Sequence, residues 1–320
     1  MSNNENKSIS IVIPVYKSEG VLKELHRRLS LALNSLTDDY EIILVNDCSP
    51  DKSWEIMNEI SKEDKCVMPI ALRRNVGYDN AVMAGLNYAS KEYVVMMDDD
   101  LQHSPEDISL LLDMFEDGYD VVYANFIKKR QALLKNLGSW MNGKLAQLII
   151  NKPPDIYLSP FKIMRREIAD VVIKYRGPFP YIDGLIFQAT SFIGQVTITH
   201  NERFTGKGNH GIYRSMKIVF NFCTTFSVLP LRLATLLGLV FSCIAGIAGI
   251  VLVLSKLVWG VELEGWTSIM LCIVIMGGIQ LVVLGIIGEY VGRLYMNINH
   301  RPQFVVKEKS EYRRMNDGEN

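Results

Sequence analysis

The sequence predicts an α/β domain with a mostly parallel sheet, followed by two membrane-spanning helices. Short β-branched runs alternate with longer amphipathic segments over the first half of the chain, which is the pattern of a doubly wound parallel sheet. Two uncharged stretches near the carboxyl terminus are each longer than the ~20 residues that cross a bilayer. Polar and acidic residues directly follow the apolar runs, so we expect a ligand site at the carboxyl ends of the strands.

Strands and helices are expected to alternate from residue 9 onward. The expected strands are Ile9–Tyr16, the apolar part of YEIILVNDCSPD (40–51), Val67–Leu72 and EYVVMMD (92–98). The expected helices are Gly20–Leu36, Ser53–Lys62 and Asn80–Ser90. Ser104 and Pro105 then form a typical helix start, as N-cap and first residue.

The carboxyl-terminal part predicts two membrane spans. Leu233–Ser255 and Gly265–Gly288 carry no charge. The alternative is a pair of helices buried in a soluble core, but such helices are rarely apolar around their whole circumference. The flanks are rich in lysine and arginine, whereas the intervening loop carries Glu262 and Glu264. The positive-inside rule therefore places both termini in the cytoplasm.

Composition and patterning set the expected domain boundaries. Lys and Arg (34) nearly balance Asp and Glu (35), which gives no reason to expect a nucleic-acid partner. The five cysteines show no CxxC spacing that would indicate zinc.

An apolar stripe through Ile212, Met216 and Val219 predicts an amphipathic helix at the membrane interface. The expected order is a domain at 1–210, an interfacial helix at 211–230, a transmembrane hairpin at 231–291 and a cytoplasmic tail at 292–320.

Three consecutive carboxylates, Asp98–Asp100, end the expected strand at 92–98. Like charges at one point repel one another unless a cation is present. If the chain stays extended, Asp98, Asp100 and Gln102 point the same way and Asp99 points elsewhere. Two carboxylates and an amide oxygen are ligands that suit Mg²⁺ or Mn²⁺. The competing interpretation is a solvated acidic turn or a helix cap, but a cap accounts for residues 104–107 and leaves 98–102 unexplained.

Several motifs, in order, resemble a known family. IVIPVY, LVNDCSPD, LRRNVGYDNAVMAGLNYA and MMDDDLQHSPE look like the GT-A domain of family 2 glycosyltransferases. DDDLQHSPE is similar in particular to the branch that loads sugars onto polyprenyl phosphates. That branch includes dolichyl-phosphate mannose synthases, bactoprenol glucosyltransferases and undecaprenyl-phosphate aminoarabinose transferases. The likeness continues through SPFKIMRRE, PYIDGL and ERFTGKGNHGIY into the two spans, and so covers nearly the whole chain.

The resemblance implies roles for individual residues. Asp47 would accept a hydrogen bond from the nucleobase, and Asp155 would act as base or organise the acceptor, with Asp100 as the second catalytic candidate. Asp98, Asp100 and Gln102 would hold Mg²⁺ or Mn²⁺ on the donor diphosphate. The residues implied in donor binding are Pro14, Tyr16, Asp47, Arg74, Asn75, Gly77, Asp98 and Asp183. Arg130 and Arg203 would hold the acceptor phosphate.

Plainer interpretations remain open for several of these residues, and the motifs depart from the family in two places. Asp155 and Asp183 fit loop or turn positions equally well, and Arg130 lies in a charge run typical of a solvated face. The usual DDGS appears as Asn46-Asp47-Cys48-Ser49, which leaves the base preference open. The juxtamembrane GKGNH (206–210) replaces forms such as GESKY, which leaves the acceptor contacts there open.

The sequence therefore predicts a metal-dependent inverting glycosyltransferase in the inner membrane. It would move a sugar from a nucleoside diphosphate, UDP being favoured, onto undecaprenyl phosphate at the cytoplasmic face, for cell-envelope glycan. One alternative is a family 2 transferase that extends a lipid-linked glycan at a sugar hydroxyl. Another is a non-catalytic membrane scaffold that binds nucleotide sugar. Paired glycine-bearing spans and the resemblance also suggest a homo-oligomer, with a tetramer as one candidate.

Overall fold

A computed structural model describes residues 7–126, 153, 155–198, 229–259, 265–299 and 302–309. The chain divides into two compact units. The first unit is Met1–Asn209 together with His300–Asn320, and the second is His210–Asn299. Each unit is described separately below. Arg130, Arg203 and the expected interfacial helix at 211–230 lie outside the described residues.

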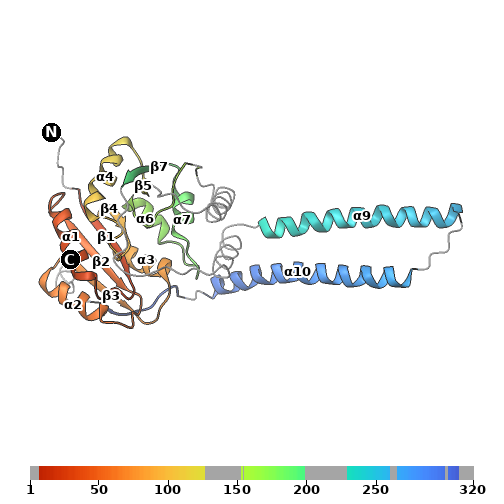
Figure 1. Ribbon diagram of the computed structural model, residues 1–320, viewed down its shortest axis with the longest axis horizontal. Helices are drawn as coiled ribbons and strands as arrows, with labels where there is room; N and C mark the ends of the chain where they lie inside the picture. The colour runs from red at the N-terminus through yellow and green to blue at the C-terminus, as the bar shows by residue number, and fades with distance from the viewer. Residues whose placement is uncertain are drawn as a thin grey trace. The chain divides into compact units, whose positions relative to one another are not determined.

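The first unit is built on an eight-stranded sheet with the order β7-β5-β6-β4-β1-β2-β3-β8 (Figure 1). Strands β1 to β4 are parallel to one another, while β6 and β8 run antiparallel to their neighbours. This confirms the predicted α/β architecture with a mostly parallel sheet. The strands are β1 (Ile9–Val15), β2 (Tyr40–Asn46), β3 (Val67–Leu72), β4 (Tyr93–Met96), β5 (Val121–Phe126), β6 (Lys162–Arg165), β7 (Ile193–Ile198) and β8 (Val306–Lys309).

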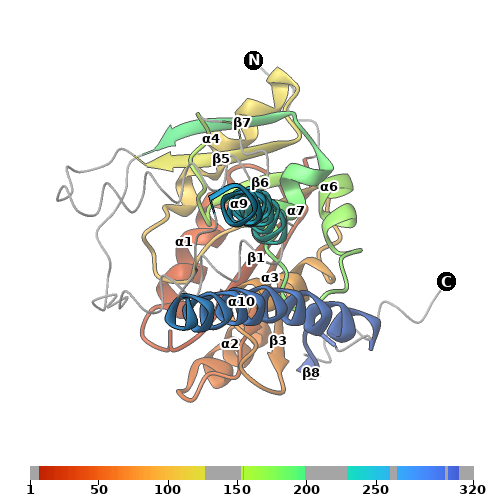
Figure 2. The same cartoon turned by 90° about the vertical axis from the view of Figure 1, so that its right-hand side faces the viewer.

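Helices cover both faces of this sheet. In the figures α1, α2 and α4 lie on one face, and α3, α6 and α7 on the other (Figures 1 and 2). The helices are α1 (Leu22–Asn34), α2 (Ser53–Glu63), α3 (Tyr78–Leu86), α4 (Ile108–Asp113), α6 (Arg166–Val172) and α7 (Ile182–Ala189), with 3₁₀ turns η1 (Pro105–Asp107) and η2 (Met114–Asp117). Ser104 occupies the expected N-cap position but makes no capping hydrogen bond through its side chain.

Alternation along β1 explains how the two helical layers are held. Ile11 and Ile13 are fully buried in the core cluster that includes the apolar residues of α1, α2 and α4. Val12 faces the other layer, where α3 approaches closely at Gly85. A β-carbon on Gly85 would lie 2.4 Å from Cγ1 of Val12, so glycine is needed there for α3 to pack against the sheet.

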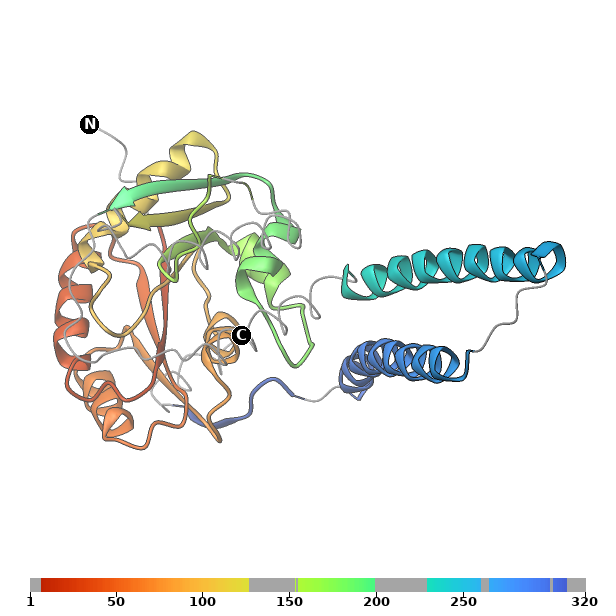
Figure 3. The ribbon, with the colours of Figure 1, turned by 45° about the vertical axis from the view of Figure 1, so that its right-hand side comes forward.

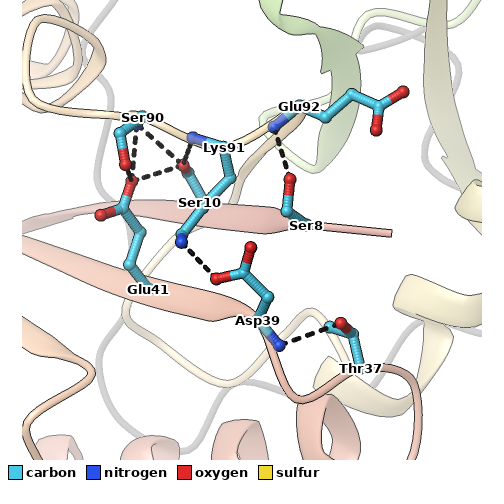
Figure 4. Close-up of polar contacts among 8 residues, drawn as sticks. All are labelled: Ser8, Ser10, Thr37, Asp39, Glu41, Ser90, Lys91 and Glu92. Atoms are coloured by element: carbon cyan, nitrogen blue, oxygen red, sulfur yellow. Dashed lines mark hydrogen bonds and ion pairs between the residues drawn. The ribbon is translucent and has the colours of Figure 1, made fainter. Parts of the chain in front are cut away.

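A buried polar network closes the amino-terminal edge of the sheet (Figure 4). Glu41, near the start of β2, is 4% exposed. Its Oε1 accepts hydrogen bonds from Ser10 Oγ at 2.7 Å and from the backbone N–H of Ser90 at 2.6 Å. The Ser10 hydroxyl accepts the N–H of Lys91 at 3.0 Å. These bonds fasten the connection between α3 and β4 to the first two strands.

The carboxyl-terminal segment, for which the sequence predicted a tail but no strand, contributes a strand to the sheet. Val306–Lys309 pairs antiparallel with β3 and forms one edge of the sheet (Figure 2). The sequence VKEK has no apolar alternation that would have indicated this. The strand therefore depends on the backbone edge that β3 presents rather than on buried side chains.

The second unit contains two long antiparallel helices, α9 (Leu229–Trp259) and α10 (Trp266–Ile298) (Figure 3). Both are long and apolar enough to cross a membrane. The window Ala234–Val251 has a mean hydropathy of 2.3 and is 6% buried, and the window Ile275–Ile298 has 1.7 and is 0% buried. The described residues of both windows are thus mostly exposed, whereas the core helices of a soluble protein are mostly buried.

Candidate active site

The turns after β1, β2 and β4 meet at the point where the strand order reverses. From β1 the chain proceeds to β2 and β3 on one side, whereas β4 lies on the other side of β1. In open α/β sheets ligands bind at this switch point, beyond the carboxyl ends of the strands. The sequence-predicted residues Tyr16, Asp47 and Asp98–Gln102 all lie in these turns. Pro14 lies just before them, buried within β1.

Each of these three turns contains a residue in the left-handed region. Lys17 follows β1 with φ 60°, Cys48 follows β2 with φ 53°, and Leu101 follows β4 with φ 58°. They are the only non-glycine residues with positive φ in the described part of the chain. Each such conformation costs about 1 kcal/mol, and strain of this kind collects at ligand sites.

Side chains link the three turns to one another. Asp99 Oδ2 accepts a hydrogen bond from the N–H of Tyr16 at 3.1 Å and another from the Ser18 hydroxyl. Lys17 N–H donates to Ser49 Oγ at 2.7 Å. Burial raises the pKa of Asp99 to about 6, although these two hydrogen bonds offset part of that effect. Asp99 thus joins the β1 and β4 turns, which is consistent with assigning it no ligand role.

Asp47 organises the turn that carries Arg74 and Asn75. Its two carboxylate oxygens accept the backbone N–H groups of Val76 at 2.7 Å and Gly77 at 3.0 Å. Gly77 has φ 87°, a conformation that L-residues rarely adopt. Burial raises the pKa of Asp47, while these hydrogen bonds lower it. The bonds to Asp47 therefore fix the backbone of the turn. Arg74 and Asn75 are exposed, so their side chains stay accessible.

Asp98 is the residue whose surroundings would favour a bound cation. Its Oδ1 is buried and has no hydrogen-bond partner in the described structure. Burial, followed by repulsion from Asp100, raises the pKa of Asp98 to about 7. The described residues contain no group of three or more His, Cys, Asp or Glu side chains that could hold a metal. The expected ligand set of Asp98, Asp100 and Gln102, two carboxylates and an amide oxygen of the kind that suits Mg²⁺ or Mn²⁺, therefore stays a prediction.

The acidic segment is not extended, as the alternation argument assumed. β4 ends at Met96, and the positive φ of Leu101 turns the chain before Gln102. The N–H of Gln102 donates to Asp100 Oδ1 at 3.1 Å. The segment is therefore a bend, and strand alternation does not decide which of its side chains share a side.

A buried lysine, absent from the sequence-based assignments, lies in the neighbouring strand. Lys162 on β6 is in register with Met96 on β4, two residues before Asp98. Its side chain is 3% exposed, and its ammonium forms an ion pair with Asp183. It lies 4.8 Å from the ring centroid of Tyr123, whose hydroxyl donates to Asp183 Oδ1 at 2.9 Å. The available signal was a single lysine in the apolar run FKIM.

Lys162 also faces a second buried carboxylate, Asp79 at the start of α3. Burial and repulsion from Asp183 raise the pKa of Asp79 to about 6, whereas Lys162 and the N–H of Ile182 lower it. Asp183, expected to contact the sugar, is thus already bound to Lys162 and Tyr123 through one oxygen. The structure brings Asp79, Asp98 and Asp183 into electrostatic contact with one ammonium.

Comparison with known proteins identifies the chain. The sequence profile described as glycosyl transferase family 2 matches residues 10–173, which is about half of the 320 residues. The chain belongs to glycosyltransferase family 2. It is 32% identical over 311 residues to the undecaprenyl-phosphate 4-deoxy-4-formamido-L-arabinose transferase of Yersinia enterocolitica, covering 96% of this chain and 95% of that one. It is also 32% identical over 303 residues to the uncharacterized glycosyltransferase YkcC of Bacillus subtilis, covering 93% of each.

The catalytic fold has solved counterparts. Glucosyl-3-phosphoglycerate synthase of Mycobacterium tuberculosis, in complex with Mn²⁺, UDP and glucosyl-3-phosphoglycerate, superimposes with a TM-score of 0.51 at 17% identity. The match covers 68% of this chain and 78% of that chain. At this identity the likeness supports the fold alone. The predicted family, fold and enzyme class are confirmed.

In this glycosyltransferase, Asp155 lies in the segment before β6 and is held by β7. Gln195 Nε2 donates to the Asp155 carbonyl at 2.8 Å, and Gln195 Oε1 accepts the N–H of Tyr157 at 3.1 Å. The side chain of Gln195 therefore fixes the backbone on both sides of Ile156. Asp155 itself is exposed, so a catalytic assignment remains a prediction.

Proposed function

We propose that this glycosyltransferase moves a sugar from a nucleoside diphosphate, with UDP favoured, onto undecaprenyl phosphate at the cytoplasmic face of the inner membrane. The observation that carries the proposal is the buried, unpartnered Asp98 oxygen beside Asp100, at the same sheet edge as the Asp47 turn. The Yersinia relative is named for transfer to undecaprenyl phosphate, and the match spans 96% of this chain.

The donor would lie against the turns after β1, β2 and β3. Tyr16 is 46% exposed and offers a ring face to a nucleobase, beside buried Pro14. Asp47 keeps lone pairs beyond the two backbone bonds and can accept from the base. Arg74 would donate to the diphosphate, with Asn75 and Gly77 shaping the turn. UDP is favoured by the sequence resemblance described above, and the mycobacterial synthase of the same fold is solved with UDP and Mn²⁺.

Asp98, Asp100 and Gln102 are the residues that would hold Mg²⁺ or Mn²⁺. When bound, the cation supplies positive charge against the negative charge that develops on the departing nucleotide. By holding the cation, the three residues would orient the donor diphosphate. Asp183, anchored by Lys162 and Tyr123, is the candidate for contacting the sugar through its remaining lone pairs.

A lipid phosphate acceptor determines what the rest of the site must do. A phosphate oxygen is already anionic at neutral pH, so it needs positioning more than deprotonation. Asp155 is proposed to organise the acceptor. Arg130 and Arg203 are proposed to hold its phosphate, and the 211–230 segment to lie in the interface beside it. The two apolar helices support anchoring in the bilayer. The lysines and arginines of their flanks favour cytoplasmic termini, and a homo-oligomer is part of the proposal.

The test uses purified protein, undecaprenyl phosphate, Mn²⁺ and a panel of UDP-, GDP- and dTDP-sugars, with products identified by mass. We expect a new lipid-phosphate sugar from one donor and none with Asp100→Ala. Consumption of a donor only when a lipid-linked glycan is supplied would replace this proposal with glycan extension. Nucleotide binding without turnover on either acceptor would favour a non-catalytic scaffold.

A further inference from the structure

The carboxyl-terminal strand reaches the turn that carries Arg74. β8 pairs with β3 through Ala71↔Glu308 and Leu72↔Val306. The pairing continues beyond the end of β3, because the N–H of Arg73 donates to the Val305 carbonyl at 2.9 Å. The last hydrogen bond of this ladder therefore falls on the residue immediately before Arg74.

The other end of the same turn is held by Asp47. Its carboxylate accepts the N–H groups of Val76 and Gly77, and its carbonyl accepts Asn75 Nδ2 at 3.2 Å. Residues 73–77 are thus anchored on the β2 side by Asp47 and on the β3 edge by β8. Of these two anchors, only β8 comes from a part of the chain that is more than 200 residues away from the turn in the sequence.

Residues 302–309, termed here the C-terminal strap, have further attachments outside the ladder. Gln303 Nε2 donates to the carbonyls of Tyr175 at 2.9 Å and Gly177 at 2.7 Å. Lys309 Nζ lies 4.8 Å from the ring centroid of Tyr88. These contacts hold both ends of the strap, although its exposed, charged strand VKEK buries little apolar surface.

We propose that the C-terminal strap is a positioning element of the donor site. By holding Arg73, it fixes the turn so that Arg74 and Asn75 are already oriented for the donor diphosphate, which lowers the ordering cost of binding. The inference rests on the proposed function, since it assigns that turn to the donor. A strand that only covered the sheet edge would affect stability and leave donor affinity unchanged.

The test compares two full-length double variants. Val306→Pro/Glu308→Pro fixes the φ angle at two positions of the strap and so disturbs its pairing with β3, whereas Val306→Ala/Glu308→Ala changes the same side chains without this restriction. We measure UDP affinity by calorimetry with Mn²⁺, donor KM and kcat, and amide hydrogen exchange over residues 73–77. The proline variant is expected to raise the UDP Kd and the donor KM about tenfold, with kcat within about twofold and faster exchange at Val76 and Gly77. The alanine variant should match the wild type.

The results of this experiment distinguish failure of the strap proposal from failure of the proposed function. UDP affinity equal in the proline variant and the wild type overturns the strap proposal and leaves the proposed function standing. A wild type that binds no nucleoside diphosphate overturns both. If the double proline variant does not fold, the single variant Glu308→Pro takes its place, with Glu308→Ala as its control. We expect Glu308→Pro to raise the UDP Kd in the same direction, and a Kd equal to that of the control overturns the proposal.

Discussion

At the amino edge of the sheet one oxygen of Glu41 accepts hydrogen bonds from Ser10 and Ser90 (Figure 4), whereas at the carboxyl edge Asp98 lies beside two further carboxylates, Asp99 and Asp100. Both carboxylates are attached to the same set of parallel strands. The amino-edge carboxylate receives hydrogen bonds from groups that the fold itself supplies. At the carboxyl edge, burial and repulsion from Asp100 raise the pKa of Asp98 to about 7, and a bound cation would lower that pKa.

The backbone conformation also differs between the two edges of the sheet. The three non-glycine residues with positive φ in the described chain all follow the carboxyl ends of strands, and none lies in the amino-edge network. Strain and unsatisfied charge are tolerated where a ligand compensates for them. We therefore expect the carboxyl edge to be the less stable one until a ligand binds, and the amino edge to contribute stability.

The largest expected effect is loss of activity at the carboxyl edge. Asp98→Asn or Asp100→Ala should lower kcat/KM at least about 10³-fold, because the charge that opposes the developing negative charge of the nucleotide is no longer held. Transfer to undecaprenyl phosphate is measured by product mass at saturating Mn²⁺. Either variant retaining more than a tenth of wild-type activity would contradict the proposed ligand set.

The second effect is on stability at the amino edge. Glu41→Leu leaves the Ser10 and Ser90 donors without their buried acceptor, which should lower the free energy of unfolding by about 2–4 kcal/mol. Asp39→Asn is the matched control. Its ion pair with Lys91 has a carboxylate 53% exposed, so its removal should change stability by less than about 1 kcal/mol. Denaturant unfolding measures both, and a folded Glu41→Leu protein should keep its donor KM.

Parts of the molecule also differ in how well the sequence alone predicts them. Strands β1 to β4 and the acidic turn follow from apolar runs that end in polar residues, which is a local signal. The strap and the Lys162–Asp183 pair have no such signal. VKEK becomes a strand only because β3 presents an edge, and Lys162 is buried only because β5 and α7 supply Tyr123 and Asp183.

The third effect has the opposite sign to that of Glu41→Leu. Because the folded-state pKa of Asp98 is raised to about 7, its protonated form stabilises the fold below pH ~4, and that stabilisation is lost as pH rises through about 7. Asp98→Asn should therefore raise the stability of the metal-free protein at pH 8 by about 1–3 kcal/mol and have little effect at pH 4. Thermal unfolding in EDTA across this range is the measurement. Equal stability of the two proteins at pH 8 would show that Asp98 is satisfied without a cation.

The smallest expected effect tests the strain at the carboxyl edge alone. Cys48 adopts φ 53° at the position where the family motif DDGS carries glycine. Cys48→Gly should be more stable than Cys48→Ala by about 0.5–1 kcal/mol, because both lose the thiol contact but only alanine keeps a β-carbon in the left-handed region. The difference is measured by denaturant unfolding of the two variants side by side. An alanine variant as stable as the glycine variant would mean that the turn relaxes, and that unsatisfied charge rather than backbone strain distinguishes the two edges.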